Sequence, residues 1–355
     1  MAPSGDAKVT AAPGPLRFVL FGAGFWARYQ LAAWGENPGA VCVAVCDRDI
    51  SRAKALADSL GIPAYEDAEA MLSAVRPDFA DIVTPVETHA SLIRLCVDQG
   101  IAAICQKPFA TTLAEAREAL AVADQANVPL LVHENWRWQT PMRRAGELLK
   151  AGRIGMPFRA RISFVCSFPV FDNQPVLREL EQFILTDIGS HVLDTARFLF
   201  GEAKSVYART RRVNPSIRGE DVAIVLMSMG DAQTIVTCEM SYASRTEYER
   251  FPQTFLFVEG TEGSLEIGPD YYLRITDATG TQIARCAPPR YAWADPAYDL
   301  VQSSMVPCQA DLLAHLQGEK TAETTGADNL ETMRLVFAAY ESAPTGQAVG
   351  INQEQ

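Results

Sequence analysis

The stretch LRFVLFGAGFWA, residues 16–27, decides the fold. A short, mostly apolar run of strand type leads at once into two glycines and a helix-like segment. This order is the context that a dinucleotide-binding turn requires, because Gly22 allows the tight turn and Gly24 lets the backbone approach a pyrophosphate. The start of the helix then offers unpaired N–H groups to the phosphates, and we include Phe25 and Trp26 among the expected cofactor-binding residues. Taken alone, the motif is equally compatible with a plain glycine turn.

A second apolar run, residues 41–46, ends in Asp47. Asp47 stands 25 positions after Gly22, about where a carboxylate accepts hydrogen bonds from the adenosine ribose hydroxyls. A carboxylate at that position repels a 2′-phosphate, so the sequence favours NAD over NADP as the cofactor. Arg48 weakens this preference, because an arginine can either stack on the adenine or pair with a phosphate.

Strand-like and helix-like segments alternate through the first 140 residues. Helices are expected over 51–60, 67–75, 88–98 and 111–125, and further strands over 79–83, 101–105 and 129–132. Such alternation predicts βαβ units in an α/β domain with a doubly wound parallel sheet of the Rossmann type. The carboxyl ends of parallel strands form the crevice in which ligands bind. The residues at or just after these strand ends are, in turn, Gly22, Asp47, Thr84, Lys107 and His133.

The strand that ends in ICQKP, residues 104–108, carries a lysine at its carboxyl end. Pro108 removes a backbone donor and stops the strand, which leaves Lys107 at the predicted crevice. On the pentapeptide alone, Lys107 is equally compatible with a surface lysine whose charged group reaches into solvent. Its place among the other strand ends makes it a candidate for contact with cofactor and substrate.

The pattern changes after about residue 144, where the segments alternate as antiparallel strands do. Strands are expected over 159–164, 206–209, 222–227, 234–238 and 254–258, hairpin turns at 260–263 and 277–280, and helices over 142–151, 301–316 and 329–342. We therefore expect a disordered tail over residues 1–15 and an NAD-binding domain over 16–140. Residues 141–355 are expected to form an α+β domain with a broad, largely antiparallel sheet, whose C-terminal helices can pack back on the first domain.

One predicted helix, residues 179–200, interrupts these strands. Asp187 and His191 are four positions apart and would share one face of it, and Asp194 follows three positions later. A histidine on a helix is equally compatible with a structural role. Gly189 lies in the middle of the predicted helix at a cost of ~1 kcal/mol relative to alanine, which indicates that something approaches this face closely.

Composition limits the classes of function. A chain of 355 residues is long enough for two domains, and its net charge of −12 argues against nucleic acid or an anionic membrane as a partner. The eight cysteines are scattered singly without metal-binding spacing, so no metal is expected. No run approaches the ~20 apolar residues of a membrane span, and the first residues lack the apolar core of a secretion signal. We expect a cytoplasmic protein.

The sequence resembles the Gfo/Idh/MocA family of NAD(P)-dependent sugar and cyclitol oxidoreductases, from residue 16 to about residue 349. The residues that carry the resemblance are Gly22-Ala23-Gly24, Thr84-Pro85 with His89, Lys107-Pro108, Asn135 with Arg137, and Asp187, Gly189, His191 and Asp194. The resemblance implies a Rossmann domain followed by an α/β domain whose sheet mediates a homodimer or homotetramer. One residue departs from the family, because Gln106 stands where members commonly have Glu.

The resemblance also implies the site residues. Lys107, Asp187 and His191 are expected to line the substrate pocket beside the nicotinamide, with Asn135 and Arg137 as further substrate-binding residues. The residues expected to contact the cofactor are those of the glycine turn together with Asp47, Arg48, Thr84, Pro85, His89, Gln106 and Lys107.

These residues suggest an NAD-dependent oxidation of a secondary alcohol in a sugar, sugar acid or cyclitol. His191 would act as the base for the hydroxyl proton, because a histidine with an ordinary pKa of ~6.5 serves both directions near neutrality. Lys107 would donate a hydrogen bond to the same oxygen, and Asp187 would position a second hydroxyl or the imidazole.

Two alternatives stay open at this stage. In the first, oxidation is transient and enables elimination, epimerisation or glycoside cleavage before the hydride returns. In the second, the protein is a non-catalytic NAD-binding regulator. Trp136 and Trp138 are compatible either with a wall on which a sugar stacks or with core packing.

Overall fold

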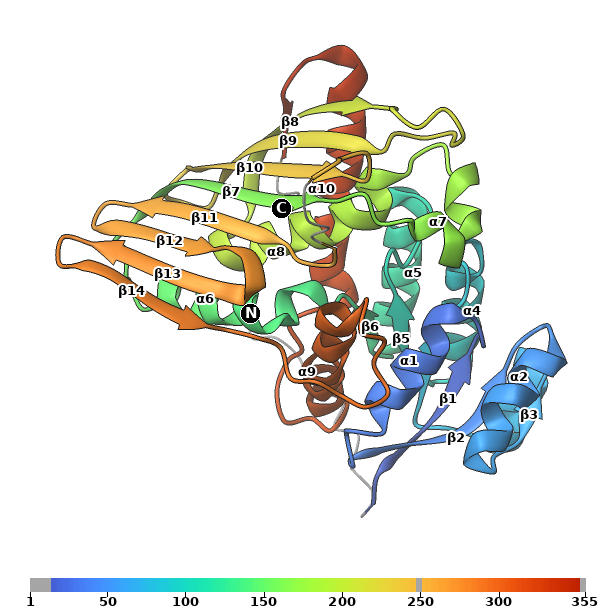
Figure 1. Cartoon of the computed structure of the whole chain (residues 1–355). Coiled ribbons are helices and arrows are strands. Elements are labelled where there is room, and N and C mark those ends of the chain that lie inside the picture. Colours follow the sequence, from blue (N-terminus) through green and yellow to red (C-terminus); the bar gives the residue numbers. More distant parts are fainter. Residues whose placement is uncertain (1–13, 247–250, 352–355) are drawn as a thin grey trace, which may run out of the picture. The chain divides into compact units, whose positions relative to one another are not determined.

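The structure is a computed structural model that describes residues 14–246 and 251–351, and its chain divides into two compact units (Figure 1). Unit 1 comprises the described part of Met1–Glu134 together with Met305–Leu330. Unit 2 comprises the described parts of Asn135–Ser304 and Glu331–Gln355. The tail predicted over residues 1–15 lies almost wholly outside the described residues.

Unit 1 contains a six-stranded parallel sheet in the order β3-β2-β1-β4-β5-β6. Its strands are β1 (Leu16–Phe21), β2 (Ala40–Cys46), β3 (Ala64–Tyr65), β4 (Phe79–Ile82), β5 (Ala102–Gln106) and β6 (Leu130–His133). The prediction of a doubly wound parallel sheet is confirmed. Because all six strands run in the same direction, their carboxyl ends lie along one edge, which brings the residues predicted at the strand ends to the same side of unit 1.

Three of the five α-helices described wholly within unit 1 begin where a side chain caps them. The five helices are α1 (Phe25–Trp34), α2 (Ile50–Ala57), α3 (Ala68–Val75), α4 (His89–Asp98) and α5 (Leu113–Ala126), with 3₁₀ turns at Asp58–Leu60 and Val86–Thr88. The carboxylates of Asp49 and Asp67 and the hydroxyl of Thr112 each accept a hydrogen bond from a backbone N–H in the first turn of the helix that follows. For this reason α3 and α5 start one and two residues later than predicted, since Asp67 and Thr112 are caps rather than helical residues.

Unit 2 contains a nine-stranded sheet in the order β14-β13-β12-β11-β7-β10-β9-β8-β15 (Figure 1). Its strands are β7 (Pro157–Val165), β8 (Ala203–Arg211), β9 (Val222–Met229), β10 (Thr234–Ser241), β11 (Phe255–Gly260), β12 (Gly263–Ile267), β13 (Tyr272–Asp277), β14 (Gly280–Arg285) and β15 (Val349–Gly350). Among the strand pairs of this sheet within the described residues, only β7 and β10 are parallel, which confirms a largely antiparallel sheet. The helices α6 (Thr140–Lys150) and α8 (Ser190–Phe200) pack against one face of this sheet.

The prediction of one continuous helix over residues 179–200 was wrong. The chain instead forms a short helix α7 (Val170–Asn173), a 3₁₀ turn at Pro175–Glu179, an extended residue, a π-helical turn at Leu185–Gly189 and then α8. The carboxylate of Glu220 accepts hydrogen bonds from the backbone N–H groups of Phe183 and Leu185, at the start of the helical stretch that runs through the π-helical turn into α8. π-helical turns occur frequently at functional sites.

Two long helices near the C-terminus each have one part assigned to unit 1 and the other part assigned to unit 2. These are α9 (Asp299–Leu316) and α10 (Gly326–Thr345), close to the two helices that the sequence predicted there. The remaining 3₁₀ turns are Trp136–Trp138 and Pro269–Tyr271.

Candidate active site

The glycine turn after β1 has the geometry that its sequence predicted. Gly22 has φ +93°, and a Cβ built on it would stand 2.3 Å from the backbone oxygen of Val83, so only glycine fits this position. Gly24 differs, because a Cβ there would have no neighbour within 4 Å. The helix α1 begins directly after Gly24 without a side-chain cap and without an acidic residue in its first turn. Its first N–H groups therefore face an open space of the kind a phosphate fills.

Asp47 is tied to this turn. One oxygen of its carboxylate accepts a hydrogen bond from the backbone N–H of Ala23 at 2.8 Å, and the other accepts from the N–H of Asp49 at 2.9 Å. A carboxylate oxygen has further lone pairs, so Asp47 can still accept from a ribose hydroxyl. Arg48 is exposed beside it.

Phe25 and Trp26 form an aromatic cluster at the start of α1. Their ring centroids are 5.3 Å apart, and Phe25 lies 5.4 Å from Tyr29, each pair in an edge-to-face arrangement. The guanidinium group of Arg28 covers the ring of Tyr29 at 4.5 Å. Both predicted residues thus pack on their own helix and remain partly exposed beside the glycine turn.

His89 connects two of the strand-end loops. Its ring nitrogens lie 2.9 Å from the backbone oxygens of Pro108, after β5, and Thr84, after β4. The ring is buried, and burial lowers the pKa of His89 below its ordinary value. His89 thus joins the loops after β4 and β5 within unit 1, and its predicted contact with the cofactor stays a prediction.

Gln106 holds the main chain of Lys107. Its Oε1 accepts a hydrogen bond from the backbone N–H of Lys107 at 3.2 Å, and its Nε2 donates to Oε1 of Gln30 on α1 at 2.6 Å. Gln30 donates in turn to Asp81 at 2.7 Å. The sequence reading missed Gln30 and Asp81. A charged residue inside a short, otherwise apolar strand was the signal that could have identified Asp81.

In unit 2, His191 lies against Trp136. The two rings are parallel, with 4° between their planes and 4.6 Å between their centroids. Both side chains are buried, and His191 is the second residue of α8. Trp136 therefore fixes the plane of the imidazole, a contact that the sequence left undecided between core packing and a sugar-stacking wall.

Asp187 lies in the π-helical turn, within reach of Tyr242. The Tyr242 hydroxyl is 3.5 Å from Oδ2 of Asp187 and is placed to donate to it. Burial, with the negative charge of Asp187, raises the pKa of Tyr242 well above its ordinary value, so the hydroxyl keeps its proton. The turn itself is anchored by Glu220, which accepts a further hydrogen bond from the Tyr340 hydroxyl at 2.7 Å. Tyr242, Glu220 and Tyr340 were not predicted from the sequence.

Gly189 has ordinary helical dihedrals, and a Cβ built on it would meet its nearest neighbours at 3.4–3.5 Å, an ordinary contact distance. The packing of unit 2 by itself therefore does not require glycine at this position. The predicted close approach to Gly189 stays a prediction about a ligand.

Asn135 and Arg137 are engaged with protein partners. Arg137 donates to both oxygens of Asp194, at 2.7 and 2.5 Å, and both side chains are buried. Asn135 donates to the backbone oxygen of Val301 and to the hydroxyl of Ser304. These contacts support the segment that carries Trp136, whereas the sequence predicted substrate binding for Asn135 and Arg137.

The described residues contain neither a metal-binding cluster nor a membrane-spanning helix. Within residues 14–246 and 251–351, no group of three His, Cys, Asp or Glu side chains is arranged to hold a metal ion. In the same described ranges, no helix is long and apolar enough to cross a membrane.

Comparisons with known proteins agree with this geometry. Residues 16–134 match the profile of an oxidoreductase family with an NAD-binding Rossmann fold, and residues 142–266 match the C-terminal domain of the same GFO/IDH/MocA family. The chain is 47% identical to a D-apiose dehydrogenase of Paraburkholderia graminis, over 93% of this chain and 88% of the relative. It is 41% identical to a D-apiose dehydrogenase of Rhizobium rhizogenes, over 95% of this chain and 97% of the relative.

Among solved structures, an oxidoreductase from Agrobacterium radiobacter in complex with NAD⁺, L-tartaric acid and magnesium superposes with a TM-score of 0.92. It is 40% identical, and the match covers 94% of this chain and 98% of that one. The chain therefore belongs to the GFO/IDH/MocA oxidoreductase family and is an NAD-dependent dehydrogenase.

Proposed function

We propose that D-apiose is the sugar that this dehydrogenase oxidises with NAD. The observation that carries the proposal is the 47% identity to a D-apiose dehydrogenase over 93% of the chain. A second D-apiose dehydrogenase, 41% identical over 95% of the chain, supports the same substrate. Relatives at 28% identity include a D-xylose 1-dehydrogenase that uses NADP⁺, so a pentose is the wider class to test.

The residues of unit 1 fit NAD. The strand-end edge offers a glycine turn that tolerates no Cβ at Gly22, open space at Gly24 and uncapped N–H groups at the start of α1 for the pyrophosphate. The carboxylate of Asp47 would hold the adenosine ribose and repel a 2′-phosphate. When bound, NAD supplies the acceptor for the electrons of the oxidised alcohol.

The chain's own residues would handle the proton and the oxygen. A ring nitrogen of His191 would take the hydroxyl proton while Trp136 keeps the imidazole in its plane. The Lys107 ammonium group would donate a hydrogen bond to the same oxygen and stabilise the negative charge that develops there. Asp187, with Tyr242 donating to it, would accept a hydrogen bond from a second hydroxyl of the sugar. Asn135 and Arg137 have supporting roles in this proposal.

The test is NADH formation, followed at 340 nm, with purified protein, NAD and a panel of D-apiose, D-xylose, inositols, aldonates and simple glycosides. We expect the highest kcat/KM with D-apiose and a lower value with NADP than with NAD. Methyl apioside, which lacks a free anomeric hydroxyl, shows whether the anomeric carbon is the one oxidised. Higher kcat/KM on any other sugar of the panel would contradict the substrate proposal.

The same assay separates the two alternatives. A transient-redox enzyme converts its substrate without net NADH, whereas a dehydrogenase accumulates NADH in proportion to the sugar consumed. A regulator binds NADH, seen as a change in nucleotide fluorescence, and turns over no sugar of the panel. Net NADH formation at a rate that scales with enzyme concentration excludes both alternatives.

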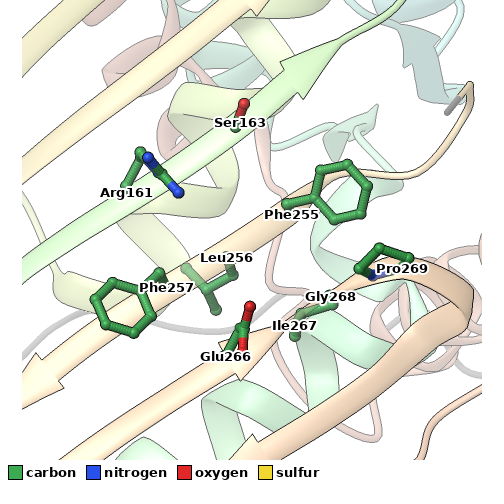
Figure 2. Close-up of a pocket in the computed structure, with 9 residues that line it drawn as sticks. All are labelled: Arg161, Ser163, Phe255, Leu256, Phe257, Glu266, Ile267, Gly268 and Pro269. Carbon is green, nitrogen blue, oxygen red and sulfur yellow. The ribbon is translucent and has the colours of Figure 1, made fainter. Parts of the chain in front are cut away.

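We also propose that a second copy of the chain covers the outer face of the unit 2 sheet, forming a homodimer or homotetramer. The outer face, away from α6 and α8, exposes Ile224, Leu226 and Ile235, at 49, 42 and 54% of their surface. Figure 2 shows a pocket on this sheet, lined by Phe255 and Phe257 of β11 together with Arg161 of β7 and Glu266 of β12.

Charges of both signs on this face suit a self-complementary contact. Arg159 pairs with Glu259 across β7 and β11, and the pocket brings Arg161 and Glu266 into its lining. Light scattering after size exclusion should show an oligomer that Ile235→Asp dissociates and that Leu60→Asp, at an exposed position of unit 1, leaves intact. A wild-type protein that is monomeric at micromolar concentration would contradict this proposal.

The cytoplasm is the location that we propose. All eight cysteines lie in the described residues, where none forms a disulfide, and burial raises the pKa of Cys46 to about 11 and that of Cys42 to about 12, as suits unreactive thiols in a reducing compartment. Fractionation of the source cells with an antibody against the protein tests this location.

A further inference from the structure

Asp81 is a carboxylate buried in the middle of the unit 1 sheet. It lies on β4, beside Leu20 of β1 and Ile104 of β5, and its side chain is fully buried. Two neutral donors of α1 reach it, Nε2 of Gln30 at 2.7 Å and Nε1 of Trp34 at 2.8 Å. A carboxylate held only by neutral donors in the interior is costly, so its retention calls for a role.

The hydrogen bonds continue from Asp81 to the main chain of Lys107. Oε1 of Gln30 accepts from Nε2 of Gln106 at 2.6 Å, and Oε1 of Gln106 accepts from the backbone N–H of Lys107 at 3.2 Å. Gln106 Nε2 also lies 3.3 Å from Nδ1 of His133 on β6. A continuous chain of three hydrogen bonds therefore joins a buried acid to the strand-end lysine.

The two ends of this chain fix the orientation of both amides. The Lys107 N–H can only donate, so the oxygen of Gln106 must face it. An ionised Asp81 can only accept, so the nitrogen of Gln30 must face the carboxylate. Every hydrogen bond then points toward Asp81. If Asp81 instead carries a proton and donates it to Gln30, the side-chain amides of Gln30 and Gln106 must each rotate by about 180°. The Nε2 group of Gln106 then faces the Lys107 N–H, and two donors cannot form a hydrogen bond.

We propose that Asp81 is a positioning residue for Lys107, acting through Gln30 and Gln106, and that protonation of Asp81 releases the Lys107 main chain. This inference rests on the role of Lys107 in the proposed function. It identifies a residue that controls the reaction without touching the sugar or NAD.

The groups around Asp81 allow its protonation to occur near neutral pH. Burial raises the pKa of Asp81 to about 7, against weaker opposing effects of the hydrogen bonds from Trp34 and Gln30. Burial also raises the pKa of Cys42 on β2 to about 12 and that of Cys105 on β5 well above its ordinary value, so these thiols stay neutral. His133 on β6 is a further titratable side chain beside this row of hydrogen bonds, since it lies against Gln106. Gln309 of α9, which donates to the backbone oxygen of Gln30, is uncharged.

The same logic explains why a glutamine, rather than a glutamate, suits position 106. A carboxylate there would have no hydrogen to donate to Gln30, so Gln30 would turn and present its oxygen to the Asp81 carboxylate. That arrangement is satisfied only if residue 81 donates. Asp81→Asn combined with Gln106→Glu should therefore restore a complete set of hydrogen bonds in which the two bonds of Gln30 are reversed and the Lys107 N–H still donates to residue 106. Gln106→Glu alone leaves two carboxylates competing for Gln30, and Asp81→Asn alone leaves an amide nitrogen facing the donor of either Gln30 or Trp34.

The first experiment needs no substrate. The sequence has six lysines, at positions 8, 54, 107, 150, 204 and 320, so selective ¹⁵N-lysine labelling gives few amide signals, and Lys107→Arg assigns the one of interest. We expect the Lys107 amide to titrate with a midpoint near pH 7 in the wild type, to titrate likewise in Asp78→Asn, and not to titrate in Asp81→Asn. No titration in the wild type, or titration that persists in Asp81→Asn, would overturn the proposal.

The second experiment is a kinetic double-mutant cycle. Asp81→Asn and Gln106→Glu should each lower kcat by about tenfold, because small displacements of a reacting group are costly, and the double variant should recover most of the loss. Losses that multiply in the double variant would overturn the proposal. If Asp81→Asn does not fold alone, recovery of folding in the double variant supports the restored set of hydrogen bonds, and failure to recover contradicts it. A wild type inactive on every sugar would refute the proposed function and leave the labelling experiment to decide this inference.

Discussion

The indole of Trp136 and the imidazole of His191 are stacked in parallel, 4.6 Å apart, within unit 2. This contact fixes the plane of the imidazole. Trp136 thereby links the 3₁₀ turn that follows β6 to the first turn of α8.

Replacing Trp136 with leucine should lower kcat by about tenfold. Loss of the stack leaves the imidazole plane of His191 unfixed, and small displacements of a reacting group are costly. Trp138→Leu is the matched control, because Trp138 is also buried but packs on Arg143, at 4.1 Å. An equal loss of kcat in both variants would contradict a specific role for the Trp136 stack.

Gly22 and Gly24 should respond differently to alanine. Gly22→Ala should destabilise unit 1, because the new Cβ would stand 2.3 Å from the Val83 oxygen at a φ of +93°. Gly24→Ala meets no atom within 4 Å and should keep the thermal midpoint of the wild type while weakening NAD binding by about tenfold or more. Calorimetry and fluorescence titration with NADH measure the two effects. Unchanged NADH affinity in Gly24→Ala would show that no phosphate approaches this glycine.

Arg137→Met should cost stability rather than substrate affinity. It leaves the buried Asp194 carboxylate without its bidentate partner, and removal of one member of a buried ion pair typically costs about 3–5 kcal/mol. Arg144→Met is the control, because its pair with Glu147 is exposed and should contribute less than about 1 kcal/mol. Urea unfolding measures both. A stable Arg137→Met protein with a raised KM for the sugar would instead support the substrate-binding role that the sequence suggested.

Asp81 should also leave a signature in the pH dependence of stability. Its pKa is raised from 3.8 to about 7, so the folded protein binds this proton more tightly than the unfolded chain does. The stabilisation that comes from this tighter proton binding by Asp81 is fully present below about pH 4 and is lost as the pH rises to about 7. The difference in unfolding free energy between wild type and Asp81→Asn should fall over that window by up to about 4 kcal/mol and be constant above it. A difference that does not vary with pH would contradict the raised pKa. His89, whose pKa is lowered, is present in both proteins, so its effect on the unfolding free energy cancels in the difference.

Local patterns were enough to predict the parallel sheet and its strand ends. Residues such as Gly22, Asp47 and Lys107 follow short apolar runs directly, and the rule that parallel strands end at one edge brings them together without further information. The hairpin turns at 260–263 and 277–280 were predicted from their glycines for the same reason and occur in the structure.

Features that depend on partners distant in the sequence could not be predicted. The start of the helical stretch that contains the π-helical turn is held by Glu220, which accepts from N–H groups more than 30 positions earlier in the chain, and the helical pattern of residues 179–200 does not reveal this partner. Asp81 receives hydrogen bonds from Gln30 and Trp34, 51 and 47 positions away. The pair of Arg137 with Asp194 spans 57 positions and places Arg137 in a buried ion pair that the local sequence does not reveal.

The steady-state kinetics of Lys107→Met, with NAD and D-apiose, test the central claim most directly. Lys107 lies at the carboxyl end of β5 among the strand-end residues, and loss of a charged donor to the reacting oxygen should lower kcat/KM by about a hundredfold or more. The thermal midpoint and the affinity for NADH should stay near those of the wild type, as in the surface control Lys54→Met. A value of kcat/KM within about tenfold of the wild type in a folded, NADH-binding Lys107→Met protein would contradict the account.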